Sequence, residues 1–257
     1  MSKTVLITGS TSGIGLATAE AFAAKGYNIV FNGLENNAAD IAAQTAKKYG
    51  VSYLFSPANL LYPETIREMV DLALHKFGSI EVAVNNAGIQ HVAPLEDFPD
   101  EKWNDVIGII LTGAFHITKA VWPGMKARKS GRVINLVSAH GLVASANKSA
   151  YVSAKHGLIG LTRTLALEGA AFGITVNAVC PGYVSTPIIE KQIPDQMRTN
   201  NMTREEVIDK IMLKEHAIKT FIPAESVAET ILFLADSAAG ATITGISLPI
   251  DAGWTAH

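Results

Sequence analysis

The chain has few of the features that mark secreted, membrane-spanning or nucleic-acid-binding proteins. Its single cysteine, Cys180, cannot form an internal disulfide and lies in an apolar run, so we expect a buried thiol in a reducing compartment. The formal net charge is only -2, with no basic stripe that would attract nucleic acid or an anionic membrane. No uninterrupted apolar run reaches membrane-spanning length, and no signal-type segment precedes Val5. These absences predict a cytoplasmic protein that binds neither membrane nor nucleic acid.

Internal repeats and low-complexity tracts are also absent, and 48% of the 257 residues are hydrophobic, which is enough for a large core. Strand-like runs alternate with helix-like stretches along the chain. The runs are residues 4–8, 28–33, 52–56, 81–86, 132–138, 175–181 and 246–251. This alternation predicts a single α/β domain over residues 1–257, with a doubly wound, seven-stranded parallel sheet of the Rossmann type. Residues 185–222 interrupt the alternation with prolines and polar helix-like segments, and we expect them to form a helical substrate lid.

Three glycines follow the first strand directly, and helical spacing of apolar residues begins after them. Gly9, Gly13 and Gly15 would let the backbone approach a pyrophosphate, whose charge the N-H groups and dipole of the next helix favour. A glycine turn alone can be an ordinary βα turn. Its position after the first strand favours a dinucleotide site.

The end of the second strand bears on the choice between NAD and NADP. Glu35 follows this strand, and no basic residue lies between Lys25 and Lys47. A carboxylate there accepts from the ribose 2′-hydroxyl and repels a 2′-phosphate, which needs Arg or Lys. The sequence therefore predicts NAD, although Glu35 could instead cap the helix that starts near Asn37.

A serine, a tyrosine and a lysine form a second constellation. Tyr151 and Lys155 are four residues apart in a stretch with helical periodicity, so they should share one helix face. A nearby ammonium favours ionisation of a phenol, whose ordinary pKa of about 10 is too high for a base at neutral pH. Ser138 ends an apolar strand, where its hydroxyl could hold a substrate oxygen. An isolated Tyr/Lys pair of this spacing would more often be a solvated surface pair.

Together these motifs resemble the short-chain dehydrogenase/reductase family over essentially the whole chain. They are Thr8-Gly-x-x-x-Gly13-x-Gly15, Asn85-Asn86-Ala87-Gly88, Ser138, Tyr151-x-x-x-Lys155 and Pro181-Gly182. The resemblance implies hydride transfer between a nicotinamide dinucleotide and an alcohol or carbonyl, with Tyr151 as acid and base. Lys155 would bind the nicotinamide ribose and lower the pKa of the phenol, and Ser138 would orient the substrate oxygen.

The same resemblance implies a cofactor site, and no metal site is predicted. The cofactor-binding positions are Gly9, Thr11, Ser12, Gly13, Ile14, Gly15, Leu34, Asn59, Leu60, Asn86, Ala87, Gly88, Tyr151, Lys155, Pro181, Gly182, Val184 and Thr186. Two positions depart from the family pattern. Ile110 stands where the family usually has a catalytic Asn, so we expect the main-chain carbonyl to remain, side-chain support for a helix distortion to be lost, and catalysis to be weakened. Asn59 stands where Asp is more common beside the adenine.

Four polar residues that follow the catalytic strands suggest the substrate. If Gln90, His140, Lys148 and Gln192 converge, they offer several donors and a positive charge to a small carboxylate. Each of them alone would pass for an ordinary loop or surface residue.

With Trp254 near the C-terminus, these four residues resemble a subgroup of the family, the bacterial D-3-hydroxybutyrate dehydrogenases. That resemblance implies NAD-dependent interconversion of (R)-3-hydroxybutyrate and acetoacetate by a homotetramer, with Gln90, His140, Lys148 and Gln192 on the carboxylate. A 3-oxoacyl-thioester or sugar reductase, and a catalytically silent dinucleotide-binding scaffold, are the alternatives.

Overall fold

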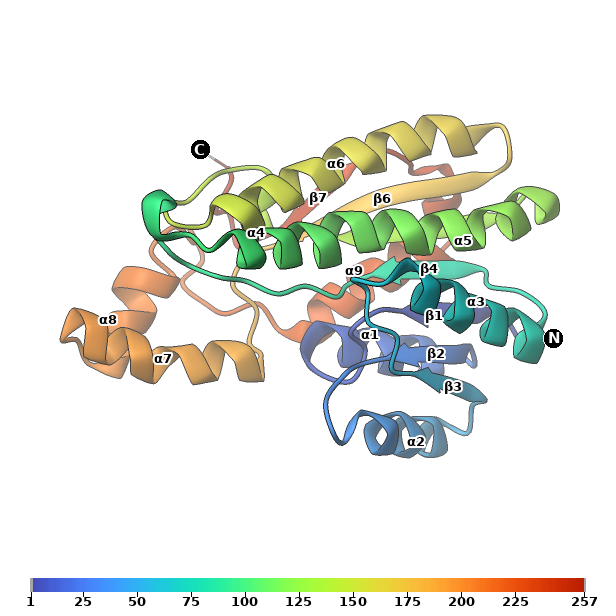
Figure 1. Cartoon of the computed structure of the whole chain (residues 1–257), viewed down its shortest axis with the longest axis horizontal. Coiled ribbons are helices and arrows are strands. Elements are labelled where there is room, and N and C mark those ends of the chain that lie inside the picture. The colour runs from blue at the N-terminus through green and yellow to red at the C-terminus, as the bar shows by residue number, and fades with distance from the viewer. Residues whose placement is uncertain (1, 257) are drawn as a thin grey trace.

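The computed structural model describes residues 2–256, except for the side chains of Pro187, Ile188, Lys191, Gln192, Asp195 and Thr199. Seven strands form one parallel sheet in the order β3-β2-β1-β4-β5-β6-β7 (Figure 1). Their bounds are β1 Thr4–Ile7, β2 Asn28–Asn32, β3 Tyr53–Ser56, β4 Val82–Asn85, β5 Gly131–Leu136, β6 Ile174–Pro181 and β7 Ser247–Ile250. The predicted doubly wound sheet is confirmed, and each strand lies within two residues of its expected position.

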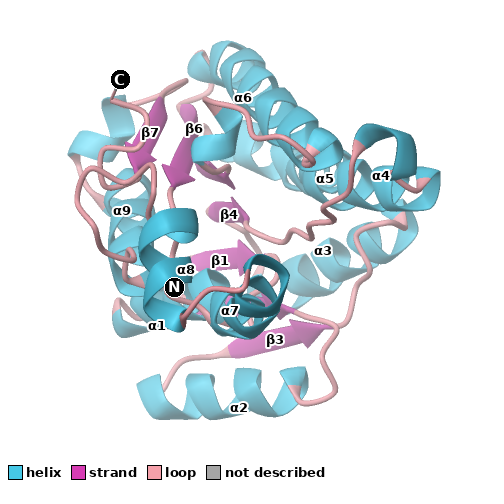
Figure 2. Ribbon diagram, turned by 90° about the vertical axis from the view of Figure 1, so that its left-hand side faces the viewer, coloured by secondary structure: helices cyan, strands magenta, loops and turns pink. Residues whose placement is uncertain are grey.

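Helices cover both faces of the sheet (Figure 2). One layer holds α1 (Gly13–Ala24), α2 (Ala38–Tyr49) and α9 (Ala224–Asp236), and the other holds α3 (Pro63–Phe77), α4 (Asp100–Ile107), α5 (Gly113–Arg128) and α6 (Ser149–Ala170). Local signals set several boundaries. Pro63 occupies the first turn of α3, and Gly50 and Gly78 end α2 and α3 in the left-handed region, at φ 67° and 81°.

Apolar side chains from each layer pack onto the sheet and form the core. Phe22 of α1 and Phe31 of β2 are fully buried on one face, and Met69 of α3 and Ile117 of α5 are fully buried on the other. Each such side chain contributes about 1.5–3 kcal/mol by leaving water. Cys180 is also fully buried, as expected, and burial raises the pKa of its thiol to about 11, so it is a poor nucleophile.

The order of the strands creates the place where a ligand can bind. The chain runs outward from β1 to β2 and β3, then crosses back to β4 on the other side of β1. Loops that leave the carboxyl ends of β1 and β4 therefore diverge, and the crevice between them is the usual ligand site of open parallel sheets.

One helical segment is long and apolar enough to span a membrane, contrary to what the sequence led us to expect. Residues Asp100–Arg128, with a mean hydropathy of 1.4, are long and apolar enough by length and composition. In the structure this segment is α4, a π-helical turn at Gly108–Thr112, and α5. Val106, Ile117 and Met125 of this segment are buried, so its apolar side is part of the protein core.

The irregular segment at residues 185–222 is helical, as predicted. It comprises α7 (Pro187–Asn200), α8 (Arg204–Val207) and a π-helical turn at Ile208–Met212, which stand apart from the sheet (Figure 1). Ile193, Val207 and Met212 give it a small core of its own. At its base, Ser185 N donates to Ile222 O at 2.9 Å and Ile222 N donates to Tyr183 O at 2.9 Å, so its two ends are joined.

Candidate functional site

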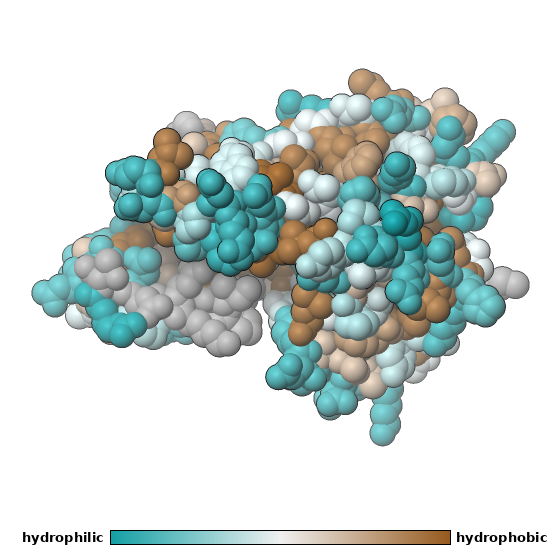
Figure 3. Space-filling view, viewed as in Figure 1, coloured by the Kyte–Doolittle hydropathy of each residue, from teal (hydrophilic) through white to brown (hydrophobic). Residues whose placement is uncertain are grey.

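A cleft of about 830 Å³ opens at the carboxyl ends of the strands. Figure 3 shows this side of the molecule hollowed between the α7/α8 segment and the body. Among predicted site residues whose side chains are described, all but Thr11 line the cleft: Gly9, Ser12, Gly13, Ile14, Gly15, Leu34, Asn59, Leu60, Asn86, Ala87, Gly88, Gln90, Ser138, His140, Lys148, Tyr151, Lys155, Pro181, Gly182, Val184, Thr186 and Trp254. The side chain of Gln192 lies outside the described residues. The volume is within the usual range for a small-molecule site.

The glycine turn forms a bare backbone cradle at one end of the cleft. Gly9 and Gly13 have φ of 61° and 50°, which L-residues rarely adopt, and a Cβ at Gly15 would collide with the carbonyl oxygen of Gly9. Helix α1 begins there with no side-chain cap and no acidic residue in its first turn. Its N-terminal N-H groups are therefore available to an anion, and the turn fits the pyrophosphate of a dinucleotide.

Hydrogen bonds join this turn to the loop after β4. Thr8 Oγ1 accepts from the backbone N-H groups of Asn86 and Ala87, each at 3.0 Å. Asn86 Nδ2 donates to the carbonyl oxygens of Thr8 at 2.8 Å and Gly9 at 2.9 Å. These bonds tie the turn after β1 to the loop after β4, the two sides of the crevice.

Glu35 contacts the glycine turn and does not cap α2. Thr11 Oγ1 donates to Glu35 Oε2 at 2.7 Å, whereas Asn37, the N-cap of α2, makes no side-chain capping bond. Partial burial acts to raise the pKa of Glu35, but hydrogen bonds from Thr11 and the backbone outweigh it and hold that pKa below its ordinary value. The Thr11 hydroxyl is thus bonded to Glu35, which lines the cleft, and a contact of Thr11 with the cofactor stays a prediction.

Asn59 uses its side-chain carbonyl locally. Its Oδ1 accepts from the backbone N-H of Leu61 at 3.1 Å, as in an Asx turn. The carbonyl oxygen of this side chain is thus engaged within its own loop.

Ser138 and Tyr151 line the same cleft. The Ser138 hydroxyl accepts from His140 N at 3.2 Å. Burial raises the pKa of the Tyr151 phenol to about 12 and outweighs the lowering of that pKa by the Ser138 hydroxyl. The expected lowering by Lys155 is therefore not what the protein alone produces, because desolvation of the phenolate dominates.

Lys155 lies one helical turn from Tyr151, as predicted, and only 3% of its surface is exposed. Its Nζ lies 5.5 Å from the centre of the Tyr151 ring and donates to Leu136 O at 2.6 Å. Burial lowers the pKa of this amine to about 7. Lys155 thus donates one proton to the carbonyl at the end of β5 and also lines the cleft.

The predicted carboxylate-binding side chains line the same cleft as the Ser138/Tyr151 pair. Gln90, His140 and Lys148 come from three different stretches of chain. Burial lowers the pKa of the partly buried Lys148, and in the described part of the chain its ammonium has neither an ion-pair nor a hydrogen-bond partner. Such a group favours an anionic ligand, because pairing offsets the cost of its desolvation.

Aromatic side chains close one wall of this region. The rings of Tyr183 and Trp254 stack with centroids 5.6 Å apart and an interplanar angle of 1°, and Trp254 also meets His140 edge to face at 5.0 Å. Sequence reasoning missed Tyr183. Its position directly after the Pro181-Gly182 pair was the available signal.

The distorted helix near Ile110 persists despite the loss of the family's Asn. A π-helical turn at Gly108–Thr112 separates α4 from α5, and Ile110 is 2% exposed. A Cβ at Gly88 would lie 3.5 Å from Ile110 Cγ1, so the side chain packs behind the loop after β4. The expected loss of side-chain support therefore does not abolish the distortion, because apolar packing supplies support instead.

Comparison with known proteins places this site in context. The short chain dehydrogenase family profile matches residues 3–197. The chain is 50% identical over 260 residues to a D-beta-hydroxybutyrate dehydrogenase of Rhizobium meliloti (strain 1021), with all of both chains covered. It is 43% identical to a protein of the same name from Cupriavidus necator, covering 99% of this chain and 98% of that one.

A solved structure, actinorhodin polyketide ketoreductase with NADPH, superposes with a TM-score of 0.93 at 30% identity, covering 100% of this chain and 98% of that one. The chain therefore belongs to the short-chain dehydrogenase family, and it is an oxidoreductase that uses a nicotinamide dinucleotide.

Proposed function

We propose that this enzyme is an NAD-dependent dehydrogenase that interconverts (R)-3-hydroxybutyrate and acetoacetate. The observation that carries the proposal is Lys148, which has no ion-pair partner among the described residues and lines the cleft with His140, Gln90, Ser138 and Tyr151. A small hydroxy acid would present its carboxylate to Lys148, His140 and Gln90. Its hydroxyl would then face Ser138 and Tyr151. The names of the two curated relatives agree with this substrate.

In this proposal Tyr151 is the acid and base. During oxidation it takes the proton of the substrate hydroxyl while hydride leaves C3; during reduction it returns a proton to the carbonyl oxygen. When bound, the nicotinamide supplies the hydride acceptor or donor. Because the phenol's pKa is raised to about 12, it is ready to donate in the reductive direction, and cationic charge must favour its ionisation in the oxidative one.

The neighbouring residues orient the substrate and the cofactor. Ser138 lines the cleft with Tyr151 and would hold the reacting oxygen beside the phenol. The protons of Lys155 that Leu136 O does not accept would bind ribose hydroxyls. Gln90, His140, Lys148 and Gln192 would bind the carboxylate, and Trp254 would close the apolar side, so that the alcohol is presented in one orientation. We further propose that the helical segment at residues 185–222 closes over the cleft as a lid.

NAD is proposed over NADP because of Glu35. Its carboxylate lies against the glycine turn with its pKa lowered, so it is ionised at neutral pH. A 2′-phosphate near this carboxylate would be repelled, and no Lys or Arg lies between Lys25 and Lys47 to bind it. We also expect a homotetramer in the cytoplasm, without membrane or nucleic-acid partners.

The direct test is NADH formation, followed by absorbance, from D-3-hydroxybutyrate and NAD. The L enantiomer and NADP are the controls, and both should be poor. Turnover of a 3-oxoacyl thioester with NADPH at higher efficiency would favour the reductase alternative, for which the NADPH-bound ketoreductase is the structural precedent. Binding of NAD without turnover of any of these would favour the silent scaffold.

A further inference from the structure

The imidazole of His140 has a protein partner that does not line the cleft. His140 Nε2 lies 2.7 Å from Ser145 Oγ, in the loop that leads to α6. The His140 ring is 5% exposed and is held edge to face against Tyr151 at 6.0 Å and Trp254 at 5.0 Å. Within the described part of the chain the other ring nitrogen, Nδ1, has no hydrogen-bond partner, although His140 lines the cleft.

A neutral imidazole carries only one N-H, so its two nitrogens play opposite roles. Burial, then the charges of Lys148 and His156, lower the pKa of His140 to about 4, and the ring is therefore neutral at physiological pH. If Nε2 holds the proton, Nδ1 is an acceptor and repels a carboxylate. If Nδ1 holds the proton, it can donate to the carboxylate, and Nε2 must then accept from its neighbour.

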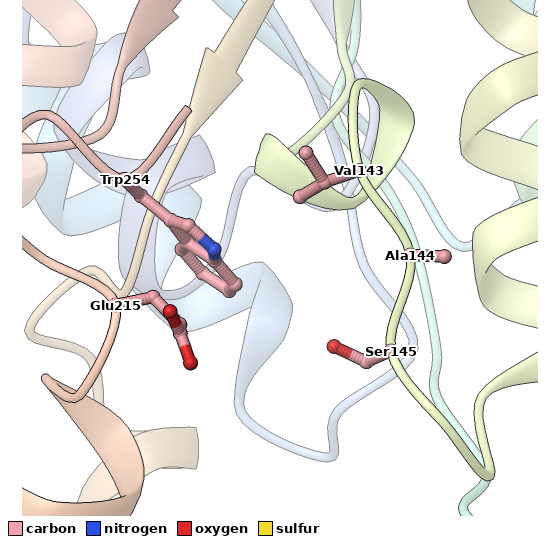
Figure 4. Close-up of a pocket in the computed structure, with 5 residues that line it drawn as sticks. All are labelled: Val143, Ala144, Ser145, Glu215 and Trp254. Atoms are coloured by element: carbon pink, nitrogen blue, oxygen red, sulfur yellow. The ribbon is translucent and has the colours of Figure 1, made fainter. Parts of the chain in front are cut away.

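The Ser145 hydroxyl can donate the hydrogen bond that His140 Nε2 would then accept. Its hydroxyl bonds no other group among the described residues. It also lines a smaller pocket, of about 250 Å³, together with Val143, Ala144, Glu215 and Trp254 (Figure 4). No hydrogen bond joins Ser145 to Glu215 in the described structure, so the hydroxyl proton is free to point to Nε2.

We propose that Ser145 is a positioning residue: by donating its hydroxyl proton to His140 Nε2, it holds the imidazole in the Nδ1-H tautomer that binds the substrate carboxylate. This inference rests on the proposed function, in which His140 contacts the carboxylate. Ser145 itself touches neither substrate nor cofactor. It acts on substrate affinity and leaves the proton and hydride steps unchanged.

The test compares Ser145→Ala with Ser145→Thr, which keeps the hydroxyl and has room for its methyl group in the smaller pocket. Loss of one neutral hydrogen bond should raise KM for (R)-3-hydroxybutyrate about 2- to 12-fold in the alanine variant. The kcat should stay within about twofold, and Ser145→Thr should restore KM. KM for the neutral methyl ester should not change.

A second measurement is made on the wild-type protein and does not depend on the folding of Ser145→Ala. Nitrogen-15 NMR of histidine-labelled wild-type protein with NAD and acetoacetate should show the His140 ring as the Nδ1-H tautomer, with the signal assigned by its loss in His140→Gln. An Nε2-H tautomer would overturn the proposal. So would an unchanged KM in Ser145→Ala, or an equal rise in KM on acid and ester.

Failure of this inference is distinguishable from failure of the proposed function. If His140→Ala raises KM for the acid but Ser145→Ala does not, only the role of Ser145 is refuted. If neither His140→Ala nor Lys148→Ala changes KM for the acid, the carboxylate site itself is refuted, and the role of Ser145 with it.

Discussion

Replacing Lys148 by Met should weaken substrate binding and stabilise the fold at the same time. Lys148 is partly buried in the cleft, burial lowers its pKa, and its ammonium has no partner in the described part of the chain. Methionine keeps the apolar stem and removes the charge. Losing a charge-assisted hydrogen bond of about 1.5–3 kcal/mol should raise KM for (R)-3-hydroxybutyrate about 10- to 150-fold.

Stability should rise although substrate binding weakens, because removing the charge breaks no ion pair among the described residues. Relief of an unpaired, desolvated ammonium at an active site should add about 0.5–2 kcal/mol to the free energy of unfolding. For a chain of this size, each kcal/mol raises Tm by about 2–4 °C. Steady-state kinetics and thermal unfolding of the same preparations measure both effects.

Lys47→Met is the matched control, because Lys47 is an exposed residue of α2 and the change in net charge is the same. It should alter neither KM nor Tm appreciably. A methyl ester of the substrate should bind wild-type enzyme poorly and respond little to Lys148→Met. A loss of Tm, or equal losses on acid and ester, would show that Lys148 supports the fold rather than a carboxylate.

Four further predictions follow from the site. Tyr151→Phe should lower kcat at least about 100-fold while NADH binding, measured by fluorescence, is retained; near-normal turnover would contradict its role as acid and base. Glu35→Gln should narrow the preference for NAD over NADP in kcat/KM, and equal use of both cofactors by wild-type enzyme would refute the role of Glu35. His140 has a folded pKa of about 4 against an ordinary 6.5, so its contribution to stability is present above pH 6.5 and is lost as the pH falls toward 4. This contribution amounts to at most about 3 kcal/mol of the free energy of unfolding. Urea unfolding at several pH values should show that the wild type loses more stability between pH 6.5 and 4 than His140→Gln does, and equal losses would contradict the reasoning. Light scattering at micromolar concentration should give a tetramer, whereas a monomer would exclude the expected assembly.

Much of the architecture could be predicted because its signals are local. Helix α3, for example, has its bounds set by nearby residues, since Pro63 starts it and Gly78 ends it in a conformation that glycine favours. The glycine turn, the strands and the helix that carries Tyr151 and Lys155 follow from the same kind of local chemistry. Their convergence on one cleft also follows, because parallel strands present their carboxyl ends at one edge of the sheet.

Other properties depend on neighbours that are distant in sequence, and only the tertiary structure decided them. Burial raises the pKa of Tyr151 although Lys155 lies one turn away, because desolvation by the whole fold outweighs one adjacent charge. Glu35 turns to Thr11 rather than to α2, and Tyr183 stacks on Trp254, because the fold brings the ends of different strands together. The amino-acid sequence by itself determined which reactive groups are present and on which elements they lie. Their protonation, partners and orientation depend on packing in three dimensions, which residue spacing along a chain does not contain.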